Sequence, residues 1–198
     1  MTKTTVFTLA AATALAILLT GCSSSEPKAT SQGVVAMTLK ASGGVTAGSP
    51  MAATAGVAAD SMGPKSATIV ISAISARQTG GDWVPVGGSF PQTVDLLALV
   101  ASGGGASLPA GALQEGSYDA LQITITSASL TLQDDTIVTI TPPGGGWVVL
   151  IPVAFEVVAG QETKITLNLR CDSSFKFANG EFEFEPEIEV EDVENEEP

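Results

Sequence analysis

The sequence predicts an all-β fold, an immunoglobulin- or transthyretin-like β-sandwich of short antiparallel strands. Apolar and polar residues alternate through many short segments. These segments are separated by turns rich in Gly and Pro, with 21 Gly and 11 Pro in 198 residues. No long stretch has apolar residues at helical spacing. A train of short strands with frequent turns is typical of a sandwich. We therefore expect one sandwich domain, over residues 33–192.

The N-terminal segment has the pattern of an export signal. Lys3 supplies a positive charge, and an apolar run follows over residues 6–19. This run is too short to cross a bilayer, which takes roughly 20 apolar residues, but it suits the central part of a secretory signal. It ends in Leu19-Thr20-Gly21-Cys22, which resembles a bacterial lipobox. We predict a signal peptide over residues 1–21 that is cleaved before a lipidated Cys22.

If Cys22 carries lipid, the protein is attached to a membrane. We predict a flexible tether at residues 22–32 between this lipid and the folded domain. One acyl chain binds membranes marginally and two or more bind stably; mature lipoproteins carry two or three. Ser23 follows the cysteine, a residue that favours the outer membrane in Gram-negative sorting. We expect a cell-envelope protein, in the outer membrane of a Gram-negative host. An ordinary secretory signal with a chance cysteine is the alternative.

The first strand is expected at residues 34–41, before a long Gly/Ala-rich loop at residues 42–66. The next segment has apolar residues in one alternating phase and then in the other: Ala67, Ile69 and Ile71, followed by Ile74 and Ala76. A change of phase within a strand predicts a β-bulge, here near Ser72-Ala73.

Further strand segments follow at short intervals, at residues 83–86, 93–100, 118–125, 130–132 and 137–141. The segment at 118–125 offers Tyr118, Leu121, Ile123 and Ile125 as core residues. Runs of three glycines begin at Gly103 and Gly144. Neither is followed by a lysine and a helix, as a phosphate-binding loop requires, so we interpret both as linkers.

The last third of the chain has the clearest alternation. Ile165, Leu167 and Leu169 alternate with polar residues, and Asn179-Gly180 is the strongest short signal for a hairpin. Beyond this hairpin, one predicted strand has an apolar face and an acidic face, before an acidic tail at residues 193–198. The apolar face holds Phe182, Phe184, Pro186, Ile188 and Val190, and the acidic face holds Glu181, Glu183, Glu185, Glu187, Glu189 and Glu191.

Several of these segments together are similar to domain-of-unknown-function family 4382. They are Thr93-Val94-Asp95-Leu96-Leu97-Ala98-Leu99, Leu108-Pro109-Ala110-Gly111, Gly116-Ser117-Tyr118 before Leu121-Gln122-Ile123, and Phe155-Glu156-Val157-Val158-Ala159-Gly160 before Ile165-Thr166-Leu167. The resemblance covers residues 67–190. It implies an exported, often lipidated, sandwich-like protein, and it implies no activity. The family's usual Thr-Asp-Ala-Pro after the first strand is replaced here by the Gly/Ala-rich stretch.

Composition narrows the function classes. The net charge of −13 disfavours nucleic acid and anionic lipid surfaces as partners, because both are polyanions. The chain has no histidine, which removes Ser-His and Cys-His nucleophile systems and the commonest metal ligand. Cys171 has no partner if Cys22 is lipidated, and we expect it to be a buried, inert thiol at a strand end. We expect no enzyme activity and no cofactor.

The remaining hypotheses are a non-catalytic structural or ligand-binding sandwich and two alternatives. One alternative is a Ca²⁺-dependent adhesion or glycan-binding module, in which Trp83, Tyr118 and Trp147 stack on sugar. Successive carboxylates on one strand face lie about 6.6–6.8 Å apart, which is poor spacing for a closed Ca²⁺ site, so only weak Ca²⁺ binding is expected of the Glu181–Glu191 face. The other alternative, a carboxylate-based hydrolase, is disfavoured. For a binding sandwich of the cell envelope, we expect the partner to be an envelope protein or a polysaccharide.

One further pair is notable. Lys40 on the first strand and Asn168 on a late one resemble the Lys–Asn isopeptide links of some Gram-positive adhesins. Such a link requires a buried carboxylate between them.

Overall fold

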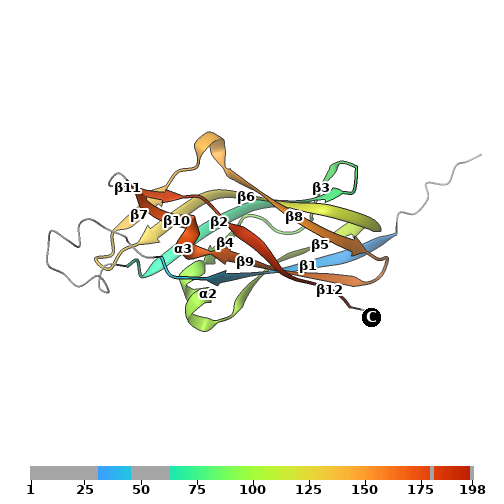
Figure 1. Cartoon of the computed structure of the whole chain (residues 1–198), viewed down its shortest axis with the longest axis horizontal. Helices are drawn as coiled ribbons and strands as arrows, with labels where there is room; N and C mark the ends of the chain where they lie inside the picture. Colours follow the sequence, from blue (N-terminus) through green and yellow to red (C-terminus); the bar gives the residue numbers. More distant parts are fainter. Residues whose placement is uncertain (1–30, 46–62, 179–180, 197–198) are drawn as a thin grey trace, which may run out of the picture.

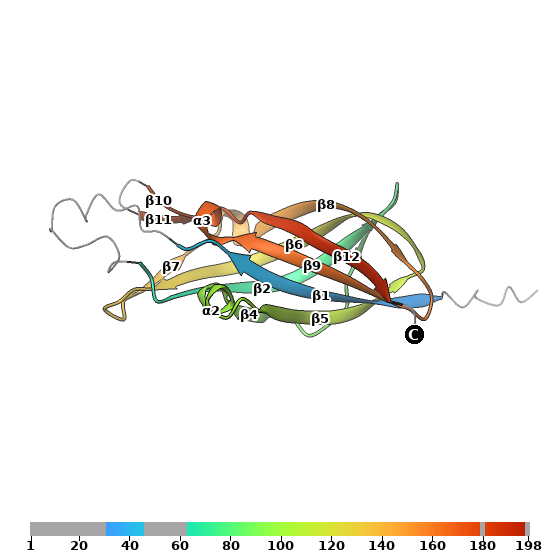
Figure 2. The same ribbon diagram turned by 60° about the horizontal axis from the view of Figure 1, so that its bottom comes forward.

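A computed structural model describes residues 31–45, 63–178 and 181–196, and its strands form two facing sheets that run roughly along the long axis (Figures 1 and 2). The four-stranded sheet has the order β12-β9-β1-β5, and the other has the order β3-β2-β6-β7, with β4 added beside β2 and β8 beside β6. The apolar residues between the sheets form one core. The predicted all-β sandwich is confirmed.

The bounds of the strands in the four-stranded sheet are β1 (Gln32–Ser42), β5 (Gly105–Gln114), β9 (Glu162–Arg170) and β12 (Ile188–Glu196). Those of the other sheet are β2 (Ser66–Gln78), β3 (Trp83–Pro85), β4 (Gln92–Asp95), β6 (Gly116–Thr131), β7 (Ile137–Ile140) and β8 (Trp147–Val157). A separate hairpin consists of β10 (Phe175–Ala178) and β11 (Glu181–Phe184). The helical segments are α2 (Leu96–Ser102), η2 (Pro143–Gly145) and α3 (Cys171–Ser174).

The signal peptide, the lipobox, most of the tether and most of the loop at 42–66 lie outside the described residues. Within them, the bulge in β2 is confirmed: Ile71 pairs with Ile125 and Ala73 with Thr124, which leaves Ser72 as the extra residue. The core residues predicted on β6 are buried, as are those predicted on β9.

Two features of the sheets differ from expectation. First, β1 and β9 are parallel, from Val34 opposite Glu162 to Ser42 opposite Arg170, whereas every strand was expected to be antiparallel. β8 and β9 are consecutive but belong to different sheets, so the turn between them does not fix the direction of β9 relative to β1. Second, one strand is longer than predicted, because residues 118–125 and 130–131 both belong to the 16-residue strand β6.

Residues 93–100 were expected to form a strand; residues 93–95 do, within β4, but the prediction is wrong for residues 96–100, because they belong to helix α2. β4 ends at Asp95, whose carboxylate accepts a hydrogen bond from the backbone N–H of Ala98 at 3.1 Å and caps α2. Gly103, with φ of 64°, ends the helix. The helix consists of good helix formers and contacts β1 of one sheet and β2 of the other, so it covers one side of the sandwich (Figure 1).

β5 was not predicted, since Pro109 and Gly111 interrupt its pattern. Proline is tolerated at the edge of a sheet, which is where β5 lies. A Cβ on Gly111 would lie 2.5 Å from the backbone N and O of Gly87, so the absent side chain allows two backbone segments to approach closely.

The continuous acidic strand expected after Asn179-Gly180 is in fact two strands. The hairpin pairing of β10 with β11 is confirmed, but β11 ends at Phe184 and β12, which begins at Ile188, pairs with β9 instead. A register shift between Val190 and Asp192 interrupts the acidic face again. The alternation itself persists, with Phe184 and Ile188 buried and the glutamates exposed. β12 also continues to Glu196, so residues 193–196 of the expected tail are paired.

The two ends of the sandwich differ. β1 begins at the end where β12 finishes, because Val34 and Glu196 are both register partners of Glu162. The β10–β11 hairpin lies at the opposite end, together with β7 (Figure 1). A tether that enters β1 therefore joins the end far from the hairpin.

Candidate functional site

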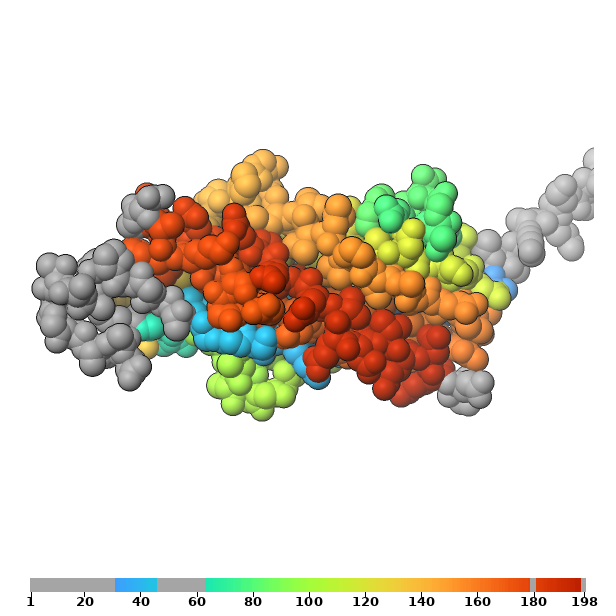
Figure 3. Space-filling model, viewed as in Figure 1, coloured from blue at the N-terminus to red at the C-terminus, as the bar shows by residue number. Residues whose placement is uncertain are grey.

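The candidate site is a groove between the first half of β8 and the hairpin end of the C-terminal segment. It consists of two adjoining hollows of about 520 Å³ and 440 Å³, which share Pro143, Trp147 and Glu185. We call it the Trp147 groove. Figure 3 shows the C-terminal segment, in red, beside the orange of β8 on this face. The other lining residues are Thr139, Ile140, Thr141, Glu181, Phe182, Glu183 and Phe184 of the first hollow, and Gly146, Val148, Val149, Leu150 and Pro186 of the second.

Aromatic rings support the floor of the groove. Trp147 is half-buried and meets Phe184 edge to face, with 4.9 Å between ring centroids. Phe184 is 3% exposed and also packs on Phe175, at 4.6 Å. The indole therefore has a fixed position at the edge of the core, and it is not a freely rotating surface side chain.

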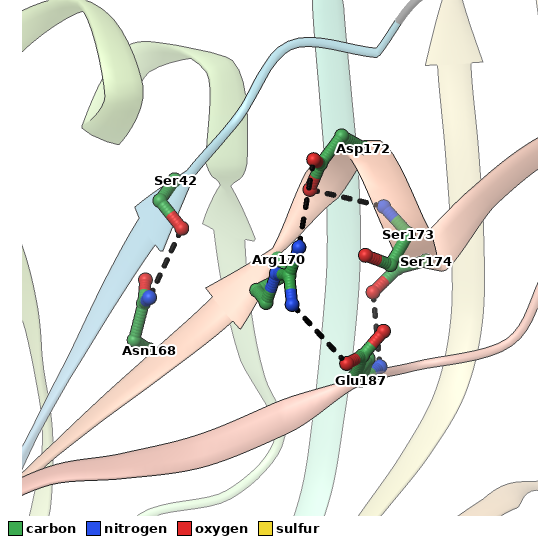
Figure 4. Close-up of polar contacts among 7 residues, drawn as sticks. All are labelled: Ser42, Asn168, Arg170, Asp172, Ser173, Ser174 and Glu187. Carbon is green, nitrogen blue, oxygen red and sulfur yellow. Dashed lines mark hydrogen bonds and ion pairs between the residues drawn. The ribbon is translucent and has the colours of Figure 1, made fainter.

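One wall of the groove is held by hydrogen bonds at the end of β9 (Figure 4). Ser174 is fully buried; its Oγ accepts a hydrogen bond from the N–H of Glu187 at 2.9 Å, and its carbonyl accepts one from the N–H of Glu185 at 2.8 Å. The N–H of Arg170 donates to the carbonyl of Glu187 at 3.0 Å. The guanidinium of Arg170 lies between Asp172, at 3.8 Å, and Glu187, at 3.6 Å. The segment that carries Glu185 and Pro186 is thus fixed in place.

The opposite wall is an edge strand with exposed apolar side chains. Val148 and Leu150 are 56% and 62% exposed. Their register partners on β6 are Thr124 and Gln122, so polar residues flank the apolar pair on the outer face of the sheet. Among the described strands, β8 pairs with β6 alone.

The groove is acidic. Glu181, Glu183 and Glu185 line it, and no basic side chain of the described residues does. Lys176 lies nearby and forms an ion pair of 2.5 Å with Glu185. The hydrogen bond between them raises the pKa of Lys176 and lowers the pKa of Glu185. All the other lysines and arginines of the described residues are also paired with acids: Lys40, Lys65, Arg77, Lys164 and Arg170.

The three aromatic residues proposed to stack on sugar do not form one site. Tyr118 is buried in the core, stacks on Phe155 at 5.1 Å and donates its hydroxyl hydrogen to the carbonyl of Gln114. Trp83 lies on β3 under the guanidinium of Arg77, 5.5 Å from the ring centroid. Only Trp147 lines the groove.

Other predicted sites have the following positions. Cys22 and the lipobox residues Leu19, Thr20 and Gly21 lie outside the described residues. Cys171 is buried at the end of β9 as predicted, and burial, helped by Asp172, raises the pKa of its thiol to about 11. In the described part of the chain, no group of three His, Cys, Asp or Glu side chains is placed to hold a metal, and no helix is long and apolar enough to cross a membrane.

Lys40 and Asn168 are register partners in the parallel β1–β9 pair. Their side chains have other contacts, however. The Lys40 ammonium lies 2.9 Å from the Glu191 carboxylate and is 41% exposed, while the Asn168 amide donates to Ser42 Oγ at 3.0 Å. The Glu191 carboxylate beside Lys40 is 47% exposed, so it is not the buried carboxylate that an isopeptide link requires.

A different hollow, of about 360 Å³, lies over β1 and β5, where small side chains such as Ala36 and Ala110 leave space beside Lys164. Lys164 is paired with Glu196 at 2.6 Å. This hollow lacks aromatic side chains, and we do not assign it a role.

The exposed edge of β8 was not predicted from the sequence. The run of apolar residues from Trp147 to Ile151 could have indicated it. A half-exposed strand ordinarily has polar residues at alternate positions, so Val148 and Leu150 are unusual.

Comparisons with known proteins bear on the family alone. No curated protein and no solved structure matches the chain. The model of the family described as "Domain of unknown function (DUF4382)" matches residues 59–186. The match begins before β2 and extends beyond β11, so it includes the Trp147 groove. The chain belongs to the DUF4382 family.

Proposed function

We propose that this protein is a lipid-anchored, non-catalytic binding module of the cell envelope, which takes its ligand in the Trp147 groove. The observation that supports this proposal is the groove itself, with a supported indole and two exposed apolar side chains beside the middle of β6. Binding sites commonly combine an apolar surface with a few polar groups that orient the ligand.

The position of the groove suits an anchored protein. A lipid on Cys22 would be attached ten residues before Gln32, where β1 begins. An extended chain spans at most about 3.3–3.6 Å per residue, so the tether would reach roughly 35 Å. Because β1 enters at the end opposite the β10–β11 hairpin (Figure 1), the end of the groove next to the hairpin would lie away from the membrane.

A non-catalytic role fits the chemistry of the groove. Its titratable groups are the exposed carboxylates of Glu181, Glu183 and Glu185, and Glu185 is already paired with Lys176. A carboxylate acid catalyst works near neutral pH when its pKa is raised by burial or by a second carboxylate. The pKa of Glu185 is shifted in the opposite direction.

Anchoring is tested by labelling cells with a radioactive fatty acid. Cys22→Ser should abolish the label and leave unprocessed or released protein, whereas Cys171→Ser, which changes the other cysteine of the chain, should keep it. Membrane attachment of a Cys22→Ser protein from which the signal has been removed would disprove the anchor.

Binding is tested with separated envelope fractions of protein, peptidoglycan and polysaccharide. The full chain should be retained by one fraction, and Leu150→Thr should weaken retention. Ile137→Thr is the matched control, because Ile137 is 67% exposed on β7 and does not line the groove. Equal retention of both variants would disprove binding at the groove.

A further inference from the structure

We infer that the ligand of the Trp147 groove is an extended, basic polypeptide segment of a partner protein, which adds to the open edge of β8 as a further strand. The partner class rests on the proposed function and specifies it.

The first step is the open edge of β8. The described residues contain no backbone hydrogen bond from residues 147–152 to any element other than β6. An unpaired strand edge presents a row of N–H and C=O groups that another extended chain can pair with. Pro152 has no N–H to donate, which limits the useful edge to residues 147–151.

The second step is a comparison with the other edges. β5 contains Pro109 and Gly111, β3 has three residues and ends at Pro85, and β12 carries acidic side chains along its exposed face. β4 and β7 are short, with four residues each. Each of these features discourages the addition of a strand. β8 instead exposes Val148 and Leu150 at successive positions of one face. Side chains on an added strand would lie about 4.5–5.5 Å away and would cover both.

The third step is charge. Three glutamates line the groove, and Lys176, the basic residue nearest to them, is engaged with Glu185. A basic segment would therefore find unpaired carboxylates at Glu181 and Glu183. A second copy of this chain is a poor occupant, because it brings the same glutamates and a net charge of −13. A neutral sugar would stack on the indole of Trp147 and would leave the backbone N–H and C=O groups at the edge of β8 without partners.

The test uses the intact chain, purified in detergent, with Trp83→Phe. The chain has two tryptophans, so this change leaves Trp147 as the only one and its fluorescence reports on the groove. The probe is a short, end-capped peptide that alternates Lys and Val. Two control peptides have Glu in place of Lys, or Pro in place of the central Val.

The Lys-Val peptide should change Trp147 emission saturably, and each control peptide should bind at least about tenfold more weakly. Salt should weaken binding of the Lys-Val peptide, because the attraction between exposed charges is screened. Leu150→Thr should weaken binding about three- to tenfold, whereas Ile137→Thr should leave it unchanged. Glu183→Gln should weaken binding of the Lys-Val peptide and should not weaken binding of the Glu-Val peptide.

Failure of the partner class and failure of the binding function give different results. If neutral oligosaccharides change Trp147 emission and the Lys-Val peptide does not, the groove binds a ligand but the polypeptide is wrong. If the Glu-Val or Pro-containing peptide binds as well as Lys-Val, the charge or strand-addition argument is overturned. If Leu150→Thr changes neither the binding of peptides nor the retention by envelope fractions, the proposed function is wrong as well.

Discussion

The rings of Trp147 and Phe184 meet edge to face, at an interplanar angle of 87°. Trp147 begins the edge strand β8, and Phe184 ends β11 of the terminal hairpin. This contact therefore connects the two walls of the groove. Aromatic pairs of this kind contribute about 0.5–1.5 kcal/mol beyond the area that they bury.

We expect Phe184→Ala to destabilise the protein by about 3–5 kcal/mol, because it removes a buried ring and leaves a cavity beneath Trp147. Urea denaturation measures this change. Phe182→Ala is the control: Phe182 is only half-buried and meets Phe177 within the hairpin, so its loss should cost less. Equal costs for the two variants would contradict the support of Trp147 by Phe184.

Local periodicity was sufficient to predict much of this fold. The alternation in β9 and the change of phase in β2 each identify core residues, because the side chains of a strand point to opposite faces in turn. Helix α2 was missed because Leu96 and Leu97 read equally well as a short buried strand. The cap at Asp95 decides between the two, and a single Asp is a weak signal in sequence. The parallel partner of β1 depends on the path of β8, far away in the chain.

The candidate site was less predictable. Trp147 was identified as a sugar-stacking residue, but so was Tyr118, which is core. The residues around Trp147 and Tyr118 in the sequence do not distinguish a strand position that faces the core from one at the edge of a sheet. That difference depends on which strand lies next to β8, and strand order is a long-range property. The break of the acidic strand after Phe184 was also hidden, because the alternation of Phe and Glu continues across it.

Gly111→Ala should be destabilising by about 1–3 kcal/mol, the usual cost of overpacking. The new Cβ would lie 2.5 Å from backbone atoms of Gly87, and backbone cannot swing aside. Gly87→Ala tests the same approach from the other side, since its Cβ would have an ordinary 3.9 Å contact with Gly111. Thermal denaturation should show a large loss for the first variant and little for the second. The reverse order would show that β5 and residues 86–88 are not packed in this way.

Millimolar Ca²⁺ should not raise the melting temperature in a saturable way that depends on Glu183, Glu185 and Glu187. These residues lie at the end of β11 and in the link to β12, and Glu185 and Glu187 face Lys176 and Arg170. A ligand that binds only the folded state stabilises it by RT ln(1 + [L]/Kd). The wild type and the triple Gln variant should therefore respond equally to Ca²⁺. A larger, saturable rise in the wild type would favour the Ca²⁺-dependent adhesion alternative.

The Cys171 thiol should make stability depend on alkaline pH. Burial raises its pKa from the ordinary value of 9.0 to about 11 in the folded protein. The folded state therefore retains a proton that the unfolded chain releases. This contribution to stability is fully present below about pH 9 and is lost as the pH rises toward 11, because the unfolded state is then favoured by ionisation of its thiol.

Cys171→Ala removes this group and leaves the other alkaline titrations unchanged. Urea denaturation of both proteins between pH 8 and about pH 11 should show a steeper loss of stability in the wild type. The thiol should also resist alkylation at pH 8 in the folded protein and react once urea unfolds it, since the thiolate is the reactive form. A native thiol that reacts at the rate of a free cysteine would show that Cys171 is accessible. Parallel pH profiles for the two proteins would show that its pKa is not raised by folding.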